Sequence, residues 1–393
     1  MPTEDEMTLN ERRKYLKVMK PRYLNAKRKE RGALLSEMER VTGMHRKSLT
    51  RLLHARSLER QKRGTPRSRS YGPEVERVIV RVWESLDYIC AERLTPGLVP
   101  MAQHLARFGE VSLTADVEEQ LASISRATVG RLLRRYRSRS GRLPQKGAER
   151  ANQVTKGVPM GRIPWDTKEP GHCEVDLVHH GGESSAGEYG HTIQMVDVAT
   201  GWSERVAVLG RAQRAMETGF ERILDRVPFE VVELHPDNGS EFFNAHLVRY
   251  WKEKVLGIHL SRSRPYQKND NRMVEQKNDT LVRQYFGHVR LDTPEQIAAM
   301  NVIYEKMWVY YNLFQPVLHL CEKTVAGDKV RRKWDRAQTP FERLKATGTL
   351  SAQQQQRLQA LYEQTNPRQL RDEIQQLLTL LWEQAIQSAS PAA

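Results

Sequence analysis

Three consecutive short segments, rich in apolar and β-branched residues, constrain the fold of this chain most. They are His172–His179, Tyr189–Val198 and Trp202–Leu209, and glycine-containing turns at 181–182 and 200–201 separate them. Short strands that follow one another across close turns pair antiparallel. The pattern then predicts a helix at about 212–226, a strand at Glu230–His235, a helix at about 240–255, a strand at Ile258–Ser261 and a long helix from about 270 to 286. The expected order, βββαβαβα, describes a mixed five-stranded α/β core within residues 166–321.

The first 56 residues have a helical pattern instead. Apolar residues recur at helical spacing from Leu9 to about Arg56, which predicts three helices. A break at residues 42–44 precedes the basic segment HRKSLTRLLHAR, and this layout is typical of a helix-turn-helix. The second helix of the pair would contact base edges and phosphates through these side chains: His45, Arg46, Lys47, Thr50 and Arg51.

A second helical module is predicted at residues 74–140, after a basic linker at 57–73. Helical spacing resumes with Val75, Val78, Ile79, Val82 and Leu86, and RATVGRLLRRYRSR follows Ser125 as another basic helix. The candidate DNA contacts there are Arg126, Arg131, Arg134 and Arg135. The two modules predict tandem helix-turn-helix units, with small helical bundles that have solvated basic faces as the alternative.

The charge of the chain is concentrated in its first part. Residues 1–150 hold 33 basic and 18 acidic residues, a net of +15, whereas residues 151–393 hold 30 of each. A basic excess of this kind favours a polyanionic partner such as nucleic acid. The 3 Cys are too few and too far apart for a disulfide framework or a zinc site, and no apolar run approaches membrane-spanning length. We therefore expect a cytoplasmic protein without a membrane partner.

A further linker is expected at residues 141–165, where Arg, Gly and Pro mix without periodicity, and a helical region at residues 322–393. In this last region an apolar stripe follows one helix: Leu370, Ile374, Leu377, Leu378 and Leu381. We expect the stripe to pack on this chain, and packing on another copy is the alternative.

Three acidic residues lie where the predicted α/β topology would bring them to one edge of the sheet. Asp176 is in the middle of an apolar strand, Asp237 directly follows the fourth strand, and Glu275 is on the last helix. An unpaired charge within an apolar strand is costly, and a metal ion would compensate it. Three hard oxygen ligands suit Mg²⁺ or Mn²⁺, and two such ions support in-line phosphoryl displacement. Individually, Asp237 could be a turn former and Glu275 a solvated helix charge.

The stretches EVDLV, DVATGWSE, HPDNGSEFFN and SRPYQKNDNRMVEQKN resemble the catalytic core of insertion-sequence transposases and retroviral integrases, the DDE recombinases of the ribonuclease H-like fold. The resemblance covers about 170–290. It implies that Asp176, Asp237 and Glu275 bind two divalent metal ions and catalyse DNA strand cleavage and strand transfer. Water would first cleave the phosphodiester at the end of the element, and the freed 3′-hydroxyl would then attack a phosphate of the target DNA.

The resemblance also implies the partners. These are double-stranded DNA, as element ends with terminal inverted repeats and as target, and further copies of the chain, because two ends are handled together. It implies a bacterial protein that associates with the nucleoid when bound to DNA. Two alternatives stay open: a DNA-binding regulator that keeps the fold without catalysis, and a plain ribonuclease H-like nuclease. Under the first hypothesis, deleting residues 1–140 would abolish end recognition and leave a folded core.

Residues near the three carboxylates receive weaker predictions. On the last helix and in the loop before it, the candidate DNA contacts are Arg264, Lys268, Arg272, Lys277 and Asn278. Asn271 and Asn278 share the helix face of Glu275, where an amide could also position the carboxylate. Strand alternation puts Glu174 and His180 on the face of Asp176. We expect His180 to be structural, with a role in the metal site as the alternative. Whether Glu174 contributes to the metal site or only resembles the metal-binding carboxylate stays open.

Overall fold

The computed structural model of the chain describes residues 7–59, 71–136, 160–161, 163–164, 166–183, 186–236, 258–263, 271–326 and 329–389. The chain forms two compact units, residues 1–70 and residues 71–393. Each unit has buried hydrophobic clusters of its own.

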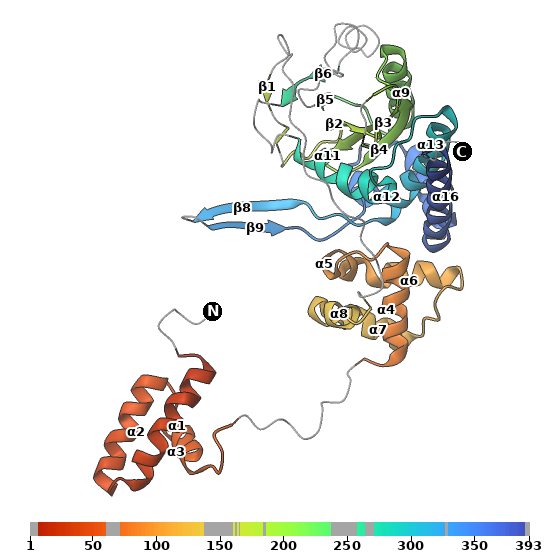
Figure 1. Cartoon of the computed structure of the whole chain (residues 1–393). Helices are drawn as coiled ribbons and strands as arrows, with labels where there is room; N and C mark the ends of the chain where they lie inside the picture. Colours follow the sequence, from red (N-terminus) through yellow and green to blue (C-terminus); the bar gives the residue numbers. More distant parts are fainter. Residues whose placement is uncertain are drawn as a thin grey trace. The chain divides into compact units, whose positions relative to one another are not determined.

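The first unit consists of three helices, as the apolar spacing predicts. They are α1 (Leu9–Asn25), α2 (Arg28–Thr42) and α3 (Arg46–His54) (Figure 1). Thr8 and Glu11 form a capping box at the start of α1, and Gly43 ends α2 with a left-handed φ of 64°. The residues that the spacing marks are buried, with Leu52 partly buried, and Ala26 joins them in the cluster: Leu16, Met19, Tyr23, Leu34, Leu35, Met38, Leu49 and Leu53.

The second unit begins with a helical segment over residues 71–136. Its elements are α4 (Pro73–Ser85), α5 (Ala91–Leu94), the 3₁₀ turn η1 (Thr95–Gly97), α6 (Leu98–Arg107), α7 (Ala115–Ser123) and α8 (Arg126–Leu133). The predicted apolar stripe of α4 is buried. The hydroxyl of Ser125 caps α8 by accepting the N–H of Thr128.

A mixed five-stranded sheet follows, as predicted. Its strands are β2 (His172–His179), β3 (Gly190–Asp197), β4 (Ser203–Leu209), β5 (Glu233–Pro236) and β6 (His259–Leu260), in the spatial order β4-β3-β2-β5-β6. β2 pairs antiparallel with β3 and parallel with β5. The strand that carries Asp176 is therefore the central one.

Helices cover both faces of the sheet. They are α9 (Gln213–Arg226), α11 (Arg272–Lys277), the π-helix η3 (Asn278–Arg283), α12 (Gln284–Phe286), α13 (Pro294–Val309) and the π-helix η4 (Tyr310–Phe314). Phe220 of α9 shares a cluster with Val175 and Ile193, whereas Met300 of α13 shares one with Val178. The long helix predicted from about 270 to 286 is interrupted, because the π-helix η3 lies between α11 and α12. The helix predicted at about 240–255 lies outside the described residues.

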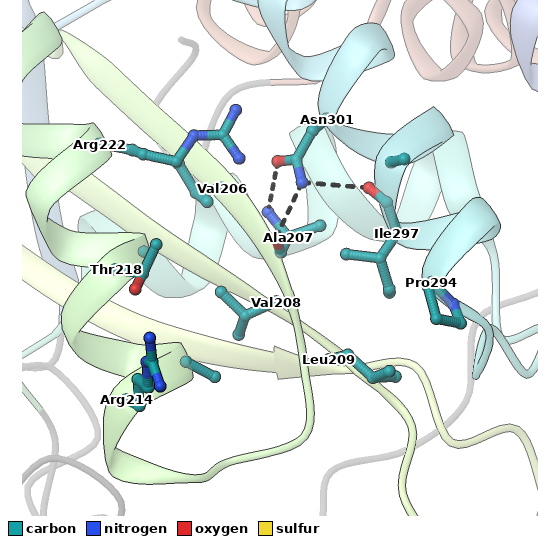
Figure 2. Close-up of a pocket in the computed structure, with 13 residues that line it drawn as sticks. Val206, Ala207, Val208, Leu209, Arg214, Thr218, Arg222, Pro294, Ile297 and Asn301 are labelled. Carbon is teal, nitrogen blue, oxygen red and sulfur yellow. Dashed lines mark hydrogen bonds between the residues drawn. The ribbon is translucent and has the colours of Figure 1, made fainter.

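The outer edge of β4 is covered by side chains instead of another strand. The amide of Asn301 donates to the carbonyl of Ala207 and accepts its N–H, both at 2.9 Å (Figure 2). The amide of Asn312 likewise accepts the Ser203 N–H at 2.9 Å and donates to the Ser203 carbonyl at 3.0 Å. Arg226 donates to the Arg205 carbonyl at 2.9 Å. These contacts satisfy backbone groups that an open sheet edge would present for pairing.

The helical segment 71–136 packs on the rest of the second unit. Buried residues of α4 to α8 and of the sheet belong to one hydrophobic cluster. The Tyr310 hydroxyl donates to the Ser85 carbonyl at 2.8 Å, and the Gln315 amide donates to the Leu86 carbonyl at 2.9 Å. Arg371 pairs with Asp87 at 3.1 Å. A deletion that ended at residue 140 would therefore expose a shared core, contrary to the expectation that the remaining core stays folded.

The C-terminal region is helical only from residue 340 onward. Its helices are α14 (Pro340–Thr347), α15 (Ala352–Gln364) and α16 (Pro367–Ala389). Ile374, Leu378 and Leu381 of α16 are buried with residues of α13, which confirms that the predicted stripe packs on this chain. The prediction of helix from residue 322 is wrong, because β8 (Leu320–Ala326) and β9 (Lys329–Trp334) form an antiparallel hairpin.

A short parallel pair joins β1 (Met160–Gly161) to β7 (Arg262–Ser263). β1 falls within the segment predicted as a linker, because a strand of two residues leaves no periodic signal. Among the described residues, no helix has the length and apolar character that crossing a membrane requires.

Candidate active site

Asp176 lies in the middle of the central strand. Strand alternation puts it on the same face as Glu174. Across the sheet its partner on β3 is Gln194, and the partner of Gln194 on β4 is Arg205. Asp176 is half-buried, whereas Glu174, Gln194 and Arg205 are buried. One row of polar side chains thus crosses three strands and ends at Asp176.

Glu174 attaches the helix that carries Glu275 to the central strand. Its carboxylate accepts the backbone N–H groups of Met273 and Val274 in the first turn of α11, at 2.7 and 2.9 Å. The first N–H groups of a helix have no partner within the helix, and a carboxylate there also interacts favourably with the helix dipole. Glu275 follows directly and is exposed. The buried carboxylate therefore fixes the start of this helix beside β2.

Burial raises the pKa of Glu174 to about 7, although the N–H donors of Val274 and Met273 and the nearby Arg272 lower it. Glu275 adds a further rise, because like charges disfavour ionisation. The carboxylate that anchors α11 therefore changes its protonation near neutral pH. The two backbone N–H groups of α11 already bind the Glu174 carboxylate within the protein. This favours an anchoring role for Glu174 over the metal-ligand role that the sequence left open.

Asn278 connects the same helical segment to Asp176. Its side-chain amide donates to Asp176 Oδ2 at 2.5 Å, and the other oxygen of Asp176 accepts the Leu177 N–H at 2.8 Å. Asn278 is the first residue of η3, and π-helical turns are frequent at functional sites. The sequence predicted that this amide could position a carboxylate, and the carboxylate it contacts is Asp176 rather than Glu275.

Asp237 itself lies outside the described residues. The residue before it, Pro236, ends β5 and pairs with Val175, the residue before Asp176. Among the described residues, no group of three or more His, Cys, Asp or Glu side chains is arranged to hold a metal ion. The two described candidates are carboxylates, and oxygen ligands of this kind suit Mg²⁺ or Mn²⁺.

The polar row behind Asp176 is incompletely hydrogen-bonded within the described part of the chain. Gln194 donates to Ser203 Oγ at 2.5 Å and Arg205 donates to the same oxygen at 3.3 Å. Gln194 Oε1, Asn278 Oδ1, two nitrogens of Arg205 and the Tyr311 hydroxyl have no such partner there. Burial lowers the pKa of Arg205, and its guanidinium lies 5.6 Å from the Tyr311 ring centre. A buried cation to which no carboxylate of the described residues is bonded thus lies in the row that ends at Asp176.

His180 has the structural surroundings that we expected. Its Nε2 is 2.8 Å from Thr192 Oγ1, which is 2.6 Å from the Tyr304 hydroxyl, and its ring meets Phe286 edge-on. Burial lowers the pKa of His180 well below its usual range, so the ring is neutral at neutral pH.

The predicted DNA contacts of the first unit differ in how free they are. Lys47 and Arg51 are exposed on α3, and His45 is exposed as the cap of that helix. Thr50 donates to the Arg46 carbonyl at 3.0 Å. The guanidinium of Arg46 is bound to α2 through Ser36 Oγ and the Gly32 carbonyl, at 3.0 and 3.1 Å. Lys47 and Arg51 are therefore the freest donors of this set.

In the second helical segment, Arg126 and Arg134 are exposed. Arg131 donates to Thr128 of its own helix at 2.9 Å, and Arg135 pairs with Glu76 at 3.2 Å. Near the carboxylates, the Lys277 ammonium lies 4.9 Å from the ring centre of Tyr311 and Arg272 is half-buried. Arg264 and Lys268 lie outside the described residues.

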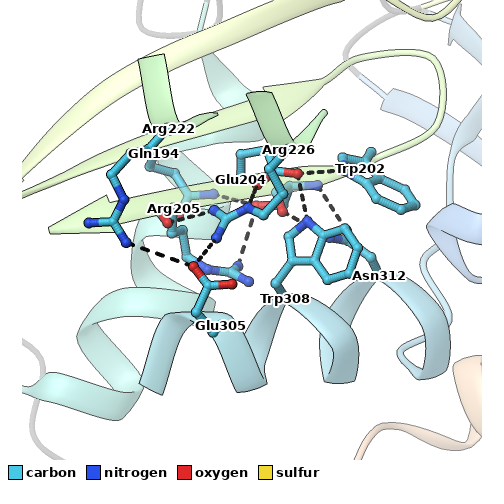
Figure 3. Close-up of polar contacts among 10 residues, drawn as sticks. Gln194, Trp202, Glu204, Arg205, Arg222, Arg226, Glu305, Trp308 and Asn312 are labelled. Carbon is cyan, nitrogen blue, oxygen red and sulfur yellow. Dashed lines mark hydrogen bonds and ion pairs between the residues drawn. The ribbon is translucent and has the colours of Figure 1, made fainter. Parts of the chain in front are cut away.

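A second charged cluster lies at the edge of the sheet and had not been predicted (Figure 3). Glu204 is fully buried, and its carboxylate accepts from Arg226 at 2.6 Å, Trp202 at 2.8 Å and Trp308 at 2.6 Å. Arg226 also pairs with Glu305 at 2.6 Å. Glu204 is the last residue of the stretch DVATGWSE. The one sequence signal that could have identified it is an acidic residue within a mostly apolar strand.

A pocket of about 680 Å³ opens between β4, α9 and α13, and Figure 2 shows its lining. Its walls are mostly apolar, with Arg214, Arg222 and Asn301 among the polar residues. Asp176, Glu275 and the polar row behind them do not line it. The pocket is thus separate from the candidate active site.

Comparisons with known proteins give one extensive sequence relative. The chain is 35% identical over 329 residues to the uncharacterized protein y4rM of Sinorhizobium fredii (strain NBRC 101917 / NGR234), which covers 82% of this chain and 91% of that protein. No family model matches the sequence. The catalytic core domain of BIV integrase aligns with 46% of this chain and 97% of its own, at 18% identity and a TM-score of 0.29. That score is too low to establish a common fold.

Proposed function

The chain belongs to the family of the uncharacterized protein y4rM, whose name states no activity, and we propose from the site itself that it is a metal-dependent DNA transposase. It binds the terminal inverted repeats of its element and catalyses DNA strand cleavage and strand transfer. The catalytic residues are Asp176, Asp237 and Glu275, which hold two Mg²⁺ or Mn²⁺ ions.

One observation carries this proposal. Two polar contacts from β2, Glu174 to the start of α11 and Asp176 to Asn278, hold the strand of one carboxylate against the helix of another. Such contacts keep catalytic groups in a defined geometry. The parallel pairing of β5 with β2 supports the third position, because Asp237 follows Pro236 as Asp176 follows Val175.

The residues would divide the work as follows. When bound, divalent cations would supply Lewis acidity at the scissile phosphate and would lower the pKa of the attacking water or 3′-hydroxyl. Asp176, Asp237 and Glu275 would hold the cations. Asn278 orients Asp176, and Glu174 fixes α11. The exposed cations of α3 and α8 hold DNA, and two or more copies act together on a pair of element ends.

The test uses the full chain, labelled duplex DNA from the borders of the segment that carries its own gene, and Mg²⁺. Cleaved and joined products are expected, and Asp176→Ala, Asp237→Ala and Glu275→Ala are each expected to lose them while binding is kept. Glu221→Ala is the matched control, because Glu221 is an exposed carboxylate on α9. Binding without cleavage in Mg²⁺ and in Mn²⁺ would overturn the proposal.

A further inference from the structure

The β8–β9 hairpin is a two-stranded ribbon that extends away from the sheet and helices of its own unit (Figure 1). The described side chains at 321–324 and 331–334 are all exposed, on both sides of the alternation. In the described part of the unit, the two strands pack mainly against each other. A hairpin of this kind gains little stability from burial. The hairpin therefore depends for its stability on the contacts that join its base to the rest of the unit.

The attachment at the base of the hairpin is well built. Asp335 accepts the His319 N–H at 2.8 Å and pairs with Arg343 of α14 at 2.6 Å. Arg343 also donates to the Val317 carbonyl at 3.0 Å. Val317 and Gln338 exchange two backbone hydrogen bonds, at 2.7 and 3.2 Å. Side chains of the folded unit therefore fix the direction in which the ribbon leaves it.

The ribbon is basic, and its cations are unpaired within the described residues. The side chains of Lys323, Arg331, Arg332 and Lys333 have no hydrogen bond or ion pair there, in contrast to Arg343 at the base. Lys323 lies directly opposite Arg332, and like charges in this position destabilise a strand pair. Lys333 is opposite Glu322 without an ion pair. The ribbon thus keeps a repulsive arrangement that an external anion would relieve.

We propose that the β8–β9 hairpin is a DNA-binding ribbon, in which Arg331, Arg332 and Lys333 contact phosphates of a duplex. Trp334, which is 51% exposed, adds an apolar surface for a sugar or base. A two-stranded ribbon fits the major groove of B-DNA. This role of the ribbon rests on the proposed transposase function only because it takes duplex DNA as the partner. A second copy of the chain is the less suitable partner, because two ribbons of the same charge would repel each other.

The first test measures affinity. The full chain and Arg331→Ala/Arg332→Ala/Lys333→Ala bind a fluorescein-labelled, random-sequence duplex at several NaCl concentrations. Each lost phosphate contact reduces the slope of log K against log[salt] by about 0.9, so the slope should fall by about 2 to 3. The matched control removes three exposed cations elsewhere, Arg211→Ala/Arg214→Ala/Arg357→Ala, and should change the slope less.

The second test uses Cys321, the exposed cysteine of β8, while Cys173 is buried. In a Cys90→Ser background, a photo-crosslinker on Cys321 should attach to the duplex, and high salt should abolish this product. An unchanged salt slope together with absent crosslinks would overturn the proposal. Crosslinks between two protein chains instead of to DNA would also overturn it and assign the ribbon to self-association. A ribbon that binds DNA in a protein without strand transfer would refute the proposed function alone.

Discussion

Two clusters of charged side chains lie on the same sheet and differ in how completely their polar atoms are hydrogen-bonded. At the edge, the carboxylate of Glu204 is fully buried and bonded to Arg226 and two tryptophans. In the row that ends at Asp176, Gln194 and Arg205 are just as buried, yet they keep polar atoms without a partner among the described residues. The first cluster is closed, whereas the second ends at a half-buried carboxylate.

This difference separates structural charge from functional charge. Leaving a buried polar group unsatisfied costs about 1–3 kcal/mol, so native proteins keep few such groups. They are expected where side chains act on something other than the protein itself. We therefore interpret Glu204 and Arg226 as internal supports. The incomplete hydrogen bonding of the Asp176 row is compatible with the ligand-binding role proposed for Asp176.

Arg226→Ala should have the largest effect on stability. It leaves Glu204 buried without a cation, and breaking a buried pair in this way costs about 3–5 kcal/mol of the free energy of unfolding. Urea denaturation measures the loss. Arg222→Ala is the matched control, because Arg222 lies one turn earlier on α9, is 47% exposed and is 3.9 Å from Glu305. Equal losses in the two variants would contradict the structural role of the Glu204 cluster.

Glu174→Gln should change how stability depends on pH. The folded pKa of about 7 lies above the usual 4.5, so the folded state binds this proton more tightly than the unfolded state. That contribution is complete below pH 4.5 and is lost as the pH rises through about 7. The unfolding free energy of the variant relative to the wild type should therefore rise across this window, by on the order of 3 kcal/mol.

Urea titrations across the window measure the difference. A constant difference between variant and wild type would show that Glu174 keeps one protonation state. Asp197, whose pKa burial raises to about 6, gives a pH dependence of the same sign in both proteins and cancels in the comparison.

Asn278→Ala should affect activity more than stability. The amide donates to Asp176, a metal ligand of the proposed function, and loss of a residue that orients a metal ligand costs about 10–100-fold in metal affinity or activity. The concentration of Mg²⁺ that supports half-maximal strand transfer should therefore rise, which a purely structural role would not cause. Gln276→Ala removes an exposed amide from the adjoining helix α11 and is the control. Equal Mg²⁺ dependence in both variants would remove Asn278 from the site.

Most strands and helices could be predicted from the sequence, because alternation and helical spacing are local signals. The strand at His172–His179 and the stripe at Val75, Val78 and Ile79 are examples. The β8–β9 hairpin was missed because its exposed, charged strands have no apolar face. The π-helix η3 was missed because the sequence pattern of a long helix does not record a widened turn.

The candidate site could be predicted as residue types but not as contacts. Asp176 and Glu275 were marked by their surroundings and by the resemblance, and Asn278 by its spacing from Glu275. That Glu174 anchors α11 could not be predicted, because its partners are backbone groups about a hundred residues away. The polar row behind Asp176 could not be predicted either. Gln194 and Arg205 lie beside Asp176 because of the register in which β2, β3 and β4 pair, and the sequence does not specify that register.

Glu305→Ala should have the smallest effect, although Glu305 contacts Arg226 at the same distance as Glu204 does, 2.6 Å. Glu305 is 53% exposed, so water already solvates its charge, and an exposed pair contributes about 0–1 kcal/mol. Salt should reduce even this contribution, because exposed charges are screened. Urea denaturation at low and high salt measures it. A loss as large as that of Arg226→Ala would mean that Arg226 stabilises the protein through Glu305, and burial of Glu204 would no longer explain why the edge cluster is closed.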